Sequence, residues 1–309
     1  MATSIDVLKI DSMNPFLTPA DDTLASFPEF KFFEASAVPN LSFKGLRIAA
    51  DSGQAVFRTL NTGKTWVAPN LVEIPIECKA VDASWKLDVL SNSYRGQEFV
   101  FSIAASTALK SAFAKYFTQL WAGTDATLGG DANGFDGLTS FIDSSHTIGT
   151  DTPDDEKKFR IFAVNTSPEA VQLCWGNGGQ VDVSEIYRST TDTSATAGYH
   201  TFAQAVCCWG AVQAQSLESA ALAYVLESEM SDARLYELLE TFKAGFEPVP
   251  IGGNDAKPKG AFFMSKGALS RLRASRTATN ERGVPAPYPT EVQGIPIFTS
   301  GCLFDIAAE

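Results

Sequence analysis

Hydrophobic and polar residues alternate along the chain between residues 55 and 89. Val72, Ile74 and Ile76 are each followed by a glutamate or a proline. A period of two is typical of extended strands with one exposed face. Earlier in the same stretch, the polar residues 61–64 predict a turn between a strand at 55–60 and a return strand at 65–68. We therefore expect an extended, half-exposed hairpin in this part of the chain.

The apolar period changes to three and four residues further along. Phe113, Phe117 and Leu120 recur at these spacings, and neither glycine nor proline occurs between residues 97 and 121. This pattern predicts one helix over about 97–121. With a rise of about 1.5 Å per residue, the helix would be on the order of 35 Å long. Gly123 is a suitable residue to end it.

The second half of the chain predicts a β-rich block, then helices. Apolar residues in short runs or alternating with polar ones indicate strands at 159–164, 171–175, 181–183 and about 199–213. Two helices are predicted at 217–229 and 235–243, the second with Ser231 as its cap and Gly245 as its end. The segment 260–300 then predicts a strand, a capped helix, a loop and a buried strand.

The first 44 residues lack a sustained period, because prolines interrupt them. Their centre nevertheless carries four aromatic rings, Phe27, Phe30, Phe32 and Phe33. Two interpretations stay open. Either the rings pack on the core of their own chain, or they anchor the arm on a neighbouring subunit, since interface cores favour aromatic side chains.

The composition of the 309 residues is that of a globular protein with a low charged fraction, 19%. The net charge of −12 is uneven, because residues 1–250 carry −14 and residues 251–309 carry +2. Sequence-specific DNA binding requires a basic surface, so this balance argues against it. We expect no secretory signal and no membrane span. Five cysteines without paired spacing predict reduced thiols in a cytosol.

Little in the sequence points to catalysis. There are only two histidines, and the motifs Gly-x-Ser-x-Gly, Ser-x-x-Lys and His-Glu-x-x-His are absent. Residues 131–137 resemble a calcium loop in composition, but an EF-hand needs an oxygen ligand in place of Phe135 and a glycine in place of Asp136. We therefore expect no enzyme activity, no cofactor and no metal. The enzymatic alternative is an intracellular thiol hydrolase that uses Cys207 or Cys208, although two small buried thiols explain that pair as well.

Three arginines, Arg271, Arg273 and Arg276, lie on and just after the helix predicted within 260–300. They have two interpretations. They form a solvated face that complements the dipole at the helix C-terminus, or they form a ring of positive charge that meets acidic faces of neighbouring copies.

The order of these elements resembles that of tailed-phage major capsid proteins with the HK97 fold. The hairpin is similar to the E-loop of that family and the long helix to its spine helix. The letters GFDGL at 134–138 are similar to the FDGL element that often follows the spine helix. The letters MS at 264–265 and GIP at 294–296 are similar to the helix start and the closing strand of the A-domain. The order of the motifs carries this resemblance, since none of them is specific alone.

The resemblance implies an α+β fold of the HK97-like capsid type. Its parts would be an N-terminal arm at 1–44, an E-loop at 45–93, the spine helix and P-domain with the β-rich block at 94–215, and an A-domain at 216–309. Only nine residues follow Ser300, and the β-rich block precedes the A-domain helix. This order resembles a permuted connectivity of the fold, as in podovirus-like capsid proteins.

The function implied by the resemblance is structural. Many copies would assemble as pentamers and hexamers into an icosahedral virion capsid around double-stranded DNA, in the host cytoplasm. The expected partners are other copies of the chain, a separate scaffold protein, a portal and a decoration protein, without a membrane and without sequence-specific DNA contacts. The scaffold is expected to be separate because the N-terminal segment is short. An encapsulin-like nanocompartment shell is the alternative.

Contacts between subunits are expected from three regions of the chain. They are the aromatic arm, the hairpin and the basic group, with the residues Phe27, Phe30, Phe32, Phe33, Lys64, Trp66, Arg271, Arg273 and Arg276. Some relatives form a covalent cross-link through an E-loop lysine, for which Lys64 is the candidate. No asparagine or glutamate partner can be identified for it.

Overall fold

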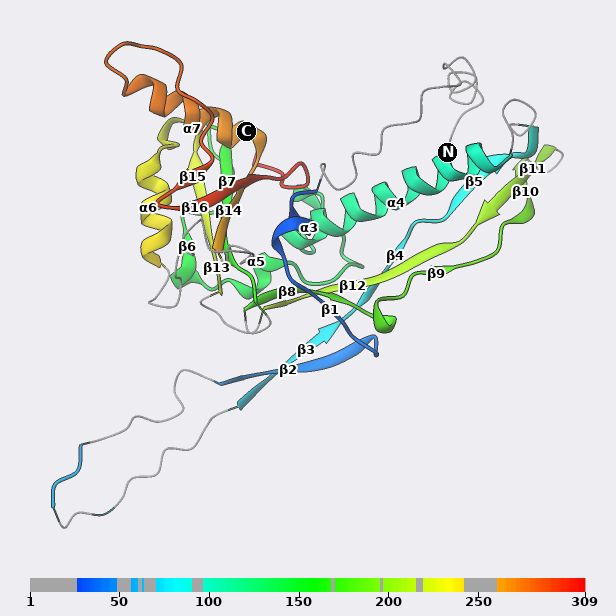
Figure 1. Ribbon diagram of the computed structural model, residues 1–309, viewed down its shortest axis with the longest axis horizontal. Coiled ribbons are helices and arrows are strands. Elements are labelled where there is room, and N and C mark those ends of the chain that lie inside the picture. The colour runs from blue at the N-terminus through cyan, green and yellow to red at the C-terminus, as the bar shows by residue number, and fades with distance from the viewer. Residues whose placement is uncertain are drawn as a thin grey trace.

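The computed structural model describes residues 27–48, 57–60, 63, 71–90, 97–167, 170–194, 197–214, 219–241 and 260–308. The body has two lobes (Figure 1). One lobe is a six-stranded sheet with two helices beside it, and the other is a long helix that runs along an extended sheet. A two-stranded ribbon projects away from the body.

The long helix α4 spans Gln97–Ala122 and confirms the helix predicted over 97–121. It ends at Gly123, whose positive φ of 61° is the left-handed conformation that favours glycine. Toward this end, the helix packs against strands of both lobes in the largest hydrophobic core. Four side chains on this face are at most 1% exposed: Tyr116, Phe117, Leu120 and Trp121.

The extended sheet lies along α4 (Figure 1). Its strands are β1 (Ala35–Ala37), β8 (Val171–Trp175), β12 (Val206–Ala214) and β4 (Lys79–Asp82) in this order, with β9 (Asp182–Val183) paired to β12. A three-stranded sheet follows, with β10 (Tyr187–Ser194), β11 (Ala197–Gln204) and β5 (Trp85–Asp88). The single strand predicted at about 199–213 is therefore two strands, β11 and β12, which separate at residue 205.

A glycine allows α4 to approach this sheet closely. A Cβ atom on Gly210 of β12 would lie 2.2 Å from the ring of Tyr116. The Tyr116 hydroxyl then donates a hydrogen bond to the carbonyl of Ala211 at 2.8 Å. Because the ring is buried, this bond satisfies its only polar group within the core.

The second sheet joins strands from both halves of the chain. Its order is β15 (Glu291–Val292), β16 (Ile295–Thr299), β14 (Gly260–Met264), β7 (Lys158–Asn165), β13 (Ala220–Leu226) and β6 (Thr147–Ile148). The helices α6 (Asp232–Thr241) and α7 (Lys266–Ala278) lie beside it (Figure 1). β6 and β7 precede the predicted boundary at residue 216 and pair with strands that follow it, so the sheet crosses that boundary.

The strand, capped helix and strand predicted within 260–300 are confirmed. Ser265 is the N-cap of α7, and its hydroxyl accepts a hydrogen bond from the backbone N–H of Ala268 at 3.1 Å. β14 and β16 are parallel neighbours. The helix α7 is the crossover connection that a parallel pair requires.

The prediction of a helix at 217–229 is wrong. The described part of that segment forms β13, and a short 3₁₀ turn follows this strand. β13 pairs along its whole length with β7. A short run of consecutive apolar residues fits a strand buried on both faces as well as a helix, so the period could not distinguish them. The helix predicted at 235–243 is α6, which begins earlier, directly after Ser231. Residues 242–245 lie outside the described residues.

The projecting ribbon consists of β2 (Ser42–Ile48) and β3 (Leu71–Glu77) in antiparallel register. It confirms extended strands around Val72 to Ile76, although β2 lies earlier in the chain than the strand predicted at 55–60. Residues 57–60 are described and are not in a strand. The predicted return strand at 65–68 lies outside the described residues.

The N-terminal arm enters the core through the short helix α3 (Glu29–Phe32). Phe32 and Phe33 contact Phe263 of β14, with ring centroids 5.2 and 5.5 Å apart. Phe33 also lies 6.0 Å from Trp121 of α4. The arm therefore fills the space between α4 and the second sheet.

The side chain of Gln119 hydrogen-bonds the loop that follows α4 to the helix. Its amide donates to the carbonyls of Asp131 and Phe135 and its oxygen accepts from the N–H of Asp131, at 2.8–3.0 Å. The glycines of the GFDGL segment permit this approach, because a Cβ on Gly134 would lie 2.3 Å from Gln119. The loop ends where the short helix α5 (Leu138–Phe141) begins. The segment is thus a structural turn.

Substitution of Gly137 by alanine tests this packing. A Cβ at this position would lie 2.5 Å from the backbone nitrogen of Gly123, which cannot move aside as a flexible side chain could. We expect Gly137→Ala to lower the free energy of unfolding by about 1–3 kcal/mol. Gly301→Ala is the control, because open space surrounds Gly301. Equal denaturant midpoints for the two variants would contradict the tight packing of this turn.

Candidate functional site

The aromatic side chains of the arm lie inside their own chain. Phe27, Phe32 and Phe33 are at most 4% exposed. Phe30 is half-buried, with its ring 4.8 Å from Phe117 and 4.9 Å from Phe113. The first of the two interpretations therefore holds for the three buried rings. The prediction that these three rings contact a neighbouring subunit is corrected, because almost none of their surface is exposed.

The three arginines make contacts within the chain. Arg276 forms a two-pronged ion pair with Asp232 of α6, with Nη2–Oδ1 and Nε–Oδ2 distances of 2.8 and 3.0 Å. Arg273 donates to the carbonyl of Ala286, and its guanidinium lies 4.2 Å from the ring centre of Tyr288. These two arginines tie α7 to its surroundings.

Arg271 differs from the other two arginines. Its side chain is 46% exposed, and it donates one hydrogen bond to the carbonyl of Glu227 at 3.0 Å. Of the predicted basic group, this side chain has the most surface available for a neighbouring copy. A ring of positive charge at Arg271 stays a prediction.

The predicted hairpin contacts Lys64 and Trp66 lie outside the described residues. Two other residues of that region, Phe57 and Leu60, are 109% and 93% exposed. We call these two side chains the ribbon tip. Sequence analysis missed them as contact residues, although large apolar side chains next to a predicted turn are a detectable signal.

A second exposed apolar surface lies where β9 continues into β10. Four large side chains within seven residues are 40–57% exposed, namely Val181, Val183, Ile186 and Tyr187. We call them the β9–β10 patch. β10 is an edge strand, paired only with β11 among the described strands. Scattered exposed apolar residues are ordinary, whereas large contiguous apolar surfaces mark interaction sites, so this group is a candidate contact surface.

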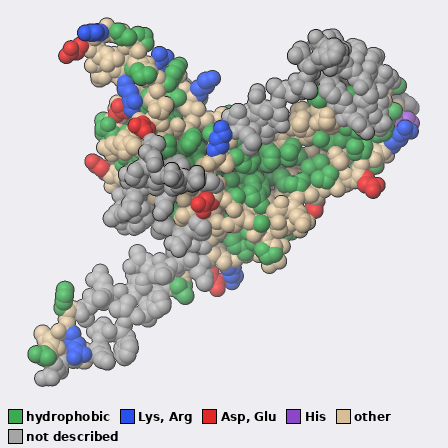
Figure 2. Space-filling view, in the orientation of Figure 1, with side chains coloured by type: hydrophobic (Ala, Val, Ile, Leu, Met, Phe, Trp, Pro, Cys, Tyr) green, Lys and Arg blue, Asp and Glu red, His purple; other side chains and the backbone are tan. Residues whose placement is uncertain are grey.

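The outer face of α4 is also poor in charge. Figure 2 shows hydrophobic side chains gathered over the part of the body that α4 forms in Figure 1. Lys110 and Lys115 are the only charged residues between Val100 and Ala122. A long solvent-exposed helix of a monomer would carry more charge than this.

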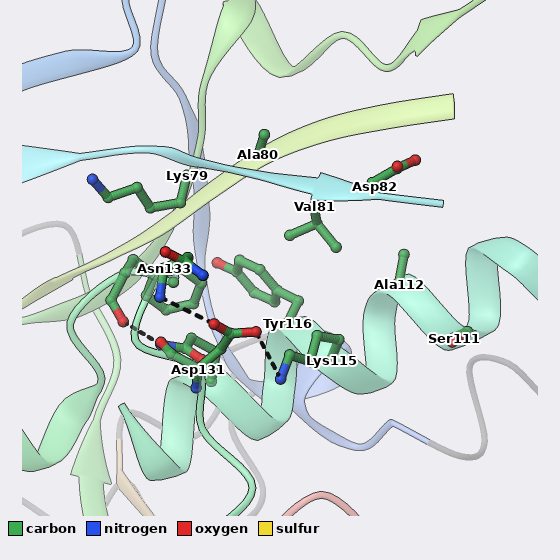
Figure 3. Close-up of a pocket in the computed structure, with 13 residues that line it drawn as sticks. Lys79, Ala80, Val81, Asp82, Ser111, Ala112, Lys115, Tyr116, Asp131 and Asn133 are labelled. Atoms are coloured by element: carbon green, nitrogen blue, oxygen red, sulfur yellow. Dashed lines mark hydrogen bonds and ion pairs between the residues drawn. The ribbon is translucent and has the colours of Figure 1, made fainter. Parts of the chain in front are cut away.

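A groove of about 340 Å³ lies between β4, α4 and the loop at 131–135 (Figure 3). Lys115 Nζ lies 3.4 Å from Asp131 Oδ2 at its wall. The pKa of Asp131 is lowered by the backbone N–H of Asn133 and by Lys115. A neighbouring hollow of about 550 Å³ shares Lys79 and Phe135 with it. Lys79 is paired with Glu77 and Lys115 with Asp131, and neither a histidine nor a cysteine is among the described residues that line the two hollows.

The cysteines are poor nucleophiles. All five are free thiols. Burial raises the pKa of Cys207 and Cys208, and it raises the pKa of Cys174 and Cys302 to about 12. A nucleophilic cysteine needs a lowered pKa. This environment argues against the thiol hydrolase alternative.

Within the described residues, no three or more histidine, cysteine, aspartate or glutamate side chains gather as a metal site would require. No helix of the same part of the chain has the length and apolar character needed to cross a membrane.

The sequence matches no family model and no curated protein. The structure, in contrast, is similar to solved phage capsids over nearly its whole length. The bacteriophage Epsilon15 structure is 11% identical, with a TM-score of 0.57 over 94% of this chain and 90% of that one. The bacteriophage JBD30 capsid is 10% identical, with a TM-score of 0.53 over 95% and 100%. The JBD30 capsid decorated with minor capsid protein trimers is 12% identical, with a TM-score of 0.52 over 96% and 98%.

These similarities confirm the predicted α+β fold of the HK97-like capsid type. At 10–12% identity they concern the fold alone. The permuted connectivity stays a prediction.

Thiol labelling tests the absence of an activated cysteine. With a pKa of about 12, about one thiol in ten thousand is ionised at pH 8 at Cys174 and Cys302. We expect native protein to react with iodoacetamide far more slowly than unfolded protein, with the half-exposed Cys207 labelled first. One thiol alkylated quickly at neutral pH, identified by mass spectrometry, would instead support the hydrolase.

Proposed function

We propose that this chain is the major capsid protein of a tailed phage. Many copies assemble as pentamers and hexamers into an icosahedral shell that encloses the double-stranded DNA genome. The shell forms in the host cytoplasm and becomes part of the virion. The capsid fold, which extends over more than nine-tenths of the chain, supports this proposal.

The projecting ribbon is the observation that carries the proposal. β2 and β3 pair only with each other among the described strands, and an isolated two-stranded ribbon is marginal in water. Phe57 and Leu60 at its tip are almost fully exposed. Burial of one such side chain contributes about 1.5–3 kcal/mol. A neighbouring copy can supply the missing cover.

The ribbon tip and the β9–β10 patch suggest how copies join. Both surfaces are apolar, and they lie on different parts of the molecule (Figure 1). A contact between the tip of one copy and the patch of the next is therefore head-to-tail. The same head-to-tail contact can form between each copy and the next, and the copies form a closed ring when the rotation from one to the next closes the circle.

The charge distribution supports the proposed content. A net charge of −12 repels DNA phosphates, so a shell of this chain encloses DNA without binding it tightly. The further partners that we propose are a separate scaffold protein, a portal and a decoration protein. The JBD30 capsid has been solved with minor capsid protein trimers on it.

Particle size tests the proposal directly. We expect purified chain, alone or with its scaffold, to form closed shells or capsomers by negative-stain electron microscopy and light scattering. A stable monomer of 33.1 kDa under both conditions would contradict it. Nucleic acid inside particles isolated from infected cells is the expected content. Protein cargo in its place would point to an encapsulin-like compartment.

Substitution of the ribbon tip tests the head-to-tail contact. We expect Phe57→Ser combined with Leu60→Ser to leave the unfolding transition unchanged, because neither side chain is buried in its own chain. Shell assembly should be lost or need a much higher protein concentration, as light scattering would detect. Arg58→Lys is the matched control at the same tip. Assembly of the double variant at the wild-type concentration would exclude the tip as a contact.

A further inference from the structure

A carboxyl group lies buried where the arm enters the core. Glu29, the first residue of α3, is 0% exposed. Its Oε1 accepts hydrogen bonds from the indole N–H of Trp121 at 3.0 Å and from the hydroxyl of Ser300. Its Oε2 has no hydrogen-bond partner among the described residues. A buried carboxyl that is only half satisfied is costly, so its presence requires an explanation.

The position of Glu29 connects three separate parts of the fold. The carboxyl belongs to the arm, Trp121 lies at the end of α4, and Ser300 directly follows β16. The ring of Phe32, three residues along, contacts both Phe263 of β14 and Phe298 of β16, at centroid distances of 5.2 and 5.8 Å. The residues 27–34 are thus a wedge between the two lobes, and Glu29 is its polar attachment.

Among the described residues, no cation forms an ion pair with this carboxyl. Arg160 of β7 is a buried cation that donates to the carbonyl of Trp121, the residue whose indole N–H binds Glu29. From the C-terminal segment, the titratable group that faces Glu29 is the thiol of Cys302. On the arm itself, Lys31 is exposed and Glu34 is half-buried. Burial raises the pKa of Glu29, and the hydrogen bonds from Ser300 and Trp121 oppose that rise only in part.

We propose that Glu29 is a proton-controlled latch that holds the wedge of residues 27–34 between the two lobes. The protonated carboxyl is accepted in the core and keeps the wedge in place. The ionised carboxyl is more stable in water than in the core, so the loss of its proton favours an open state in which the wedge has left the core. This inference concerns the folded chain and does not depend on whether the chain forms a shell.

The direction of the pH effect follows from the two states. In the open state, Glu29 has the ordinary pKa of a glutamate, 4.5, whereas in the closed state burial raises it. The closed state is therefore most stable below the ordinary pKa. Its stability falls as the pH rises from there toward the raised pKa, and stays constant above it. Each unit of difference corresponds to about a tenfold change in the equilibrium.

Hydrogen–deuterium exchange of the full-length chain tests the latch. Peptides that cover residues 27–34 and 297–303 are compared between wild type and Glu29→Gln at each pH from about 4 to about 8, so that the intrinsic pH dependence of exchange cancels. We expect wild type to lose protection relative to the variant as the pH rises above the ordinary glutamate pKa of 4.5, with no further loss once the pH exceeds the raised pKa. Glu34→Gln is the matched control, and it should retain the full wild-type response.

A second variant separates the latch from a merely structural role. Ser300 favours the ionised form of Glu29 through its hydrogen bond, so Ser300→Ala should move the transition to higher pH. A purely structural loss would lower protection equally at every pH. The latch is wrong if the wild type shows no pH-dependent loss in residues 27–34, or if Glu29→Gln shows the same loss as wild type.

Discussion

The buried face of α4 is the packing on which both lobes depend. One part of this face, around Tyr116, contacts the extended sheet at Gly210, where a glycine lets the two backbones approach. The other part, around Trp121, contacts Phe162 and Phe263 of the second sheet at ring distances of 5.0 and 4.9 Å. A single rigid helix therefore sets how the two lobes lie relative to each other. Because protein cores are closely packed, any change in this relation must first move the rings along α4.

The sequence predicted those elements that carry their own local signals. The period of three and four defined α4, and Ser265 marked the start of α7. β13 was missed because its apolar run has no period, and only its pairing with β7 decides that it is a strand. The arm shows the same limit, since four phenylalanines indicate burial but do not say in which chain.

The structure was likewise needed to identify the two exposed apolar surfaces, the ribbon tip and the β9–β10 patch. Tyr187 and Phe202 are both aromatic residues of one hairpin, yet Tyr187 is 49% exposed and Phe202 is 6% exposed. No pattern in the sequence separates these two positions. The ribbon tip was closer to detection, because Phe57 and Leu60 adjoin a predicted turn. The predicted contacts Lys64 and Trp66 belong to the same hairpin but lie outside the described residues.

The buried Glu29 is informative because a carboxyl that is only half satisfied is a costly group to place in a core. Unpaired carboxyls in a core lower stability, and their replacement by apolar groups is often favourable. The carboxyl lies at the one junction where the arm, α4 and the end of β16 meet. In the proposed shell of pentamers and hexamers, identical chains occupy two different surroundings. The proposed latch, held firmly when Glu29 is protonated and less firmly when it is ionised, would let the lobes adjust to both, whereas a fully apolar wedge would fix one arrangement.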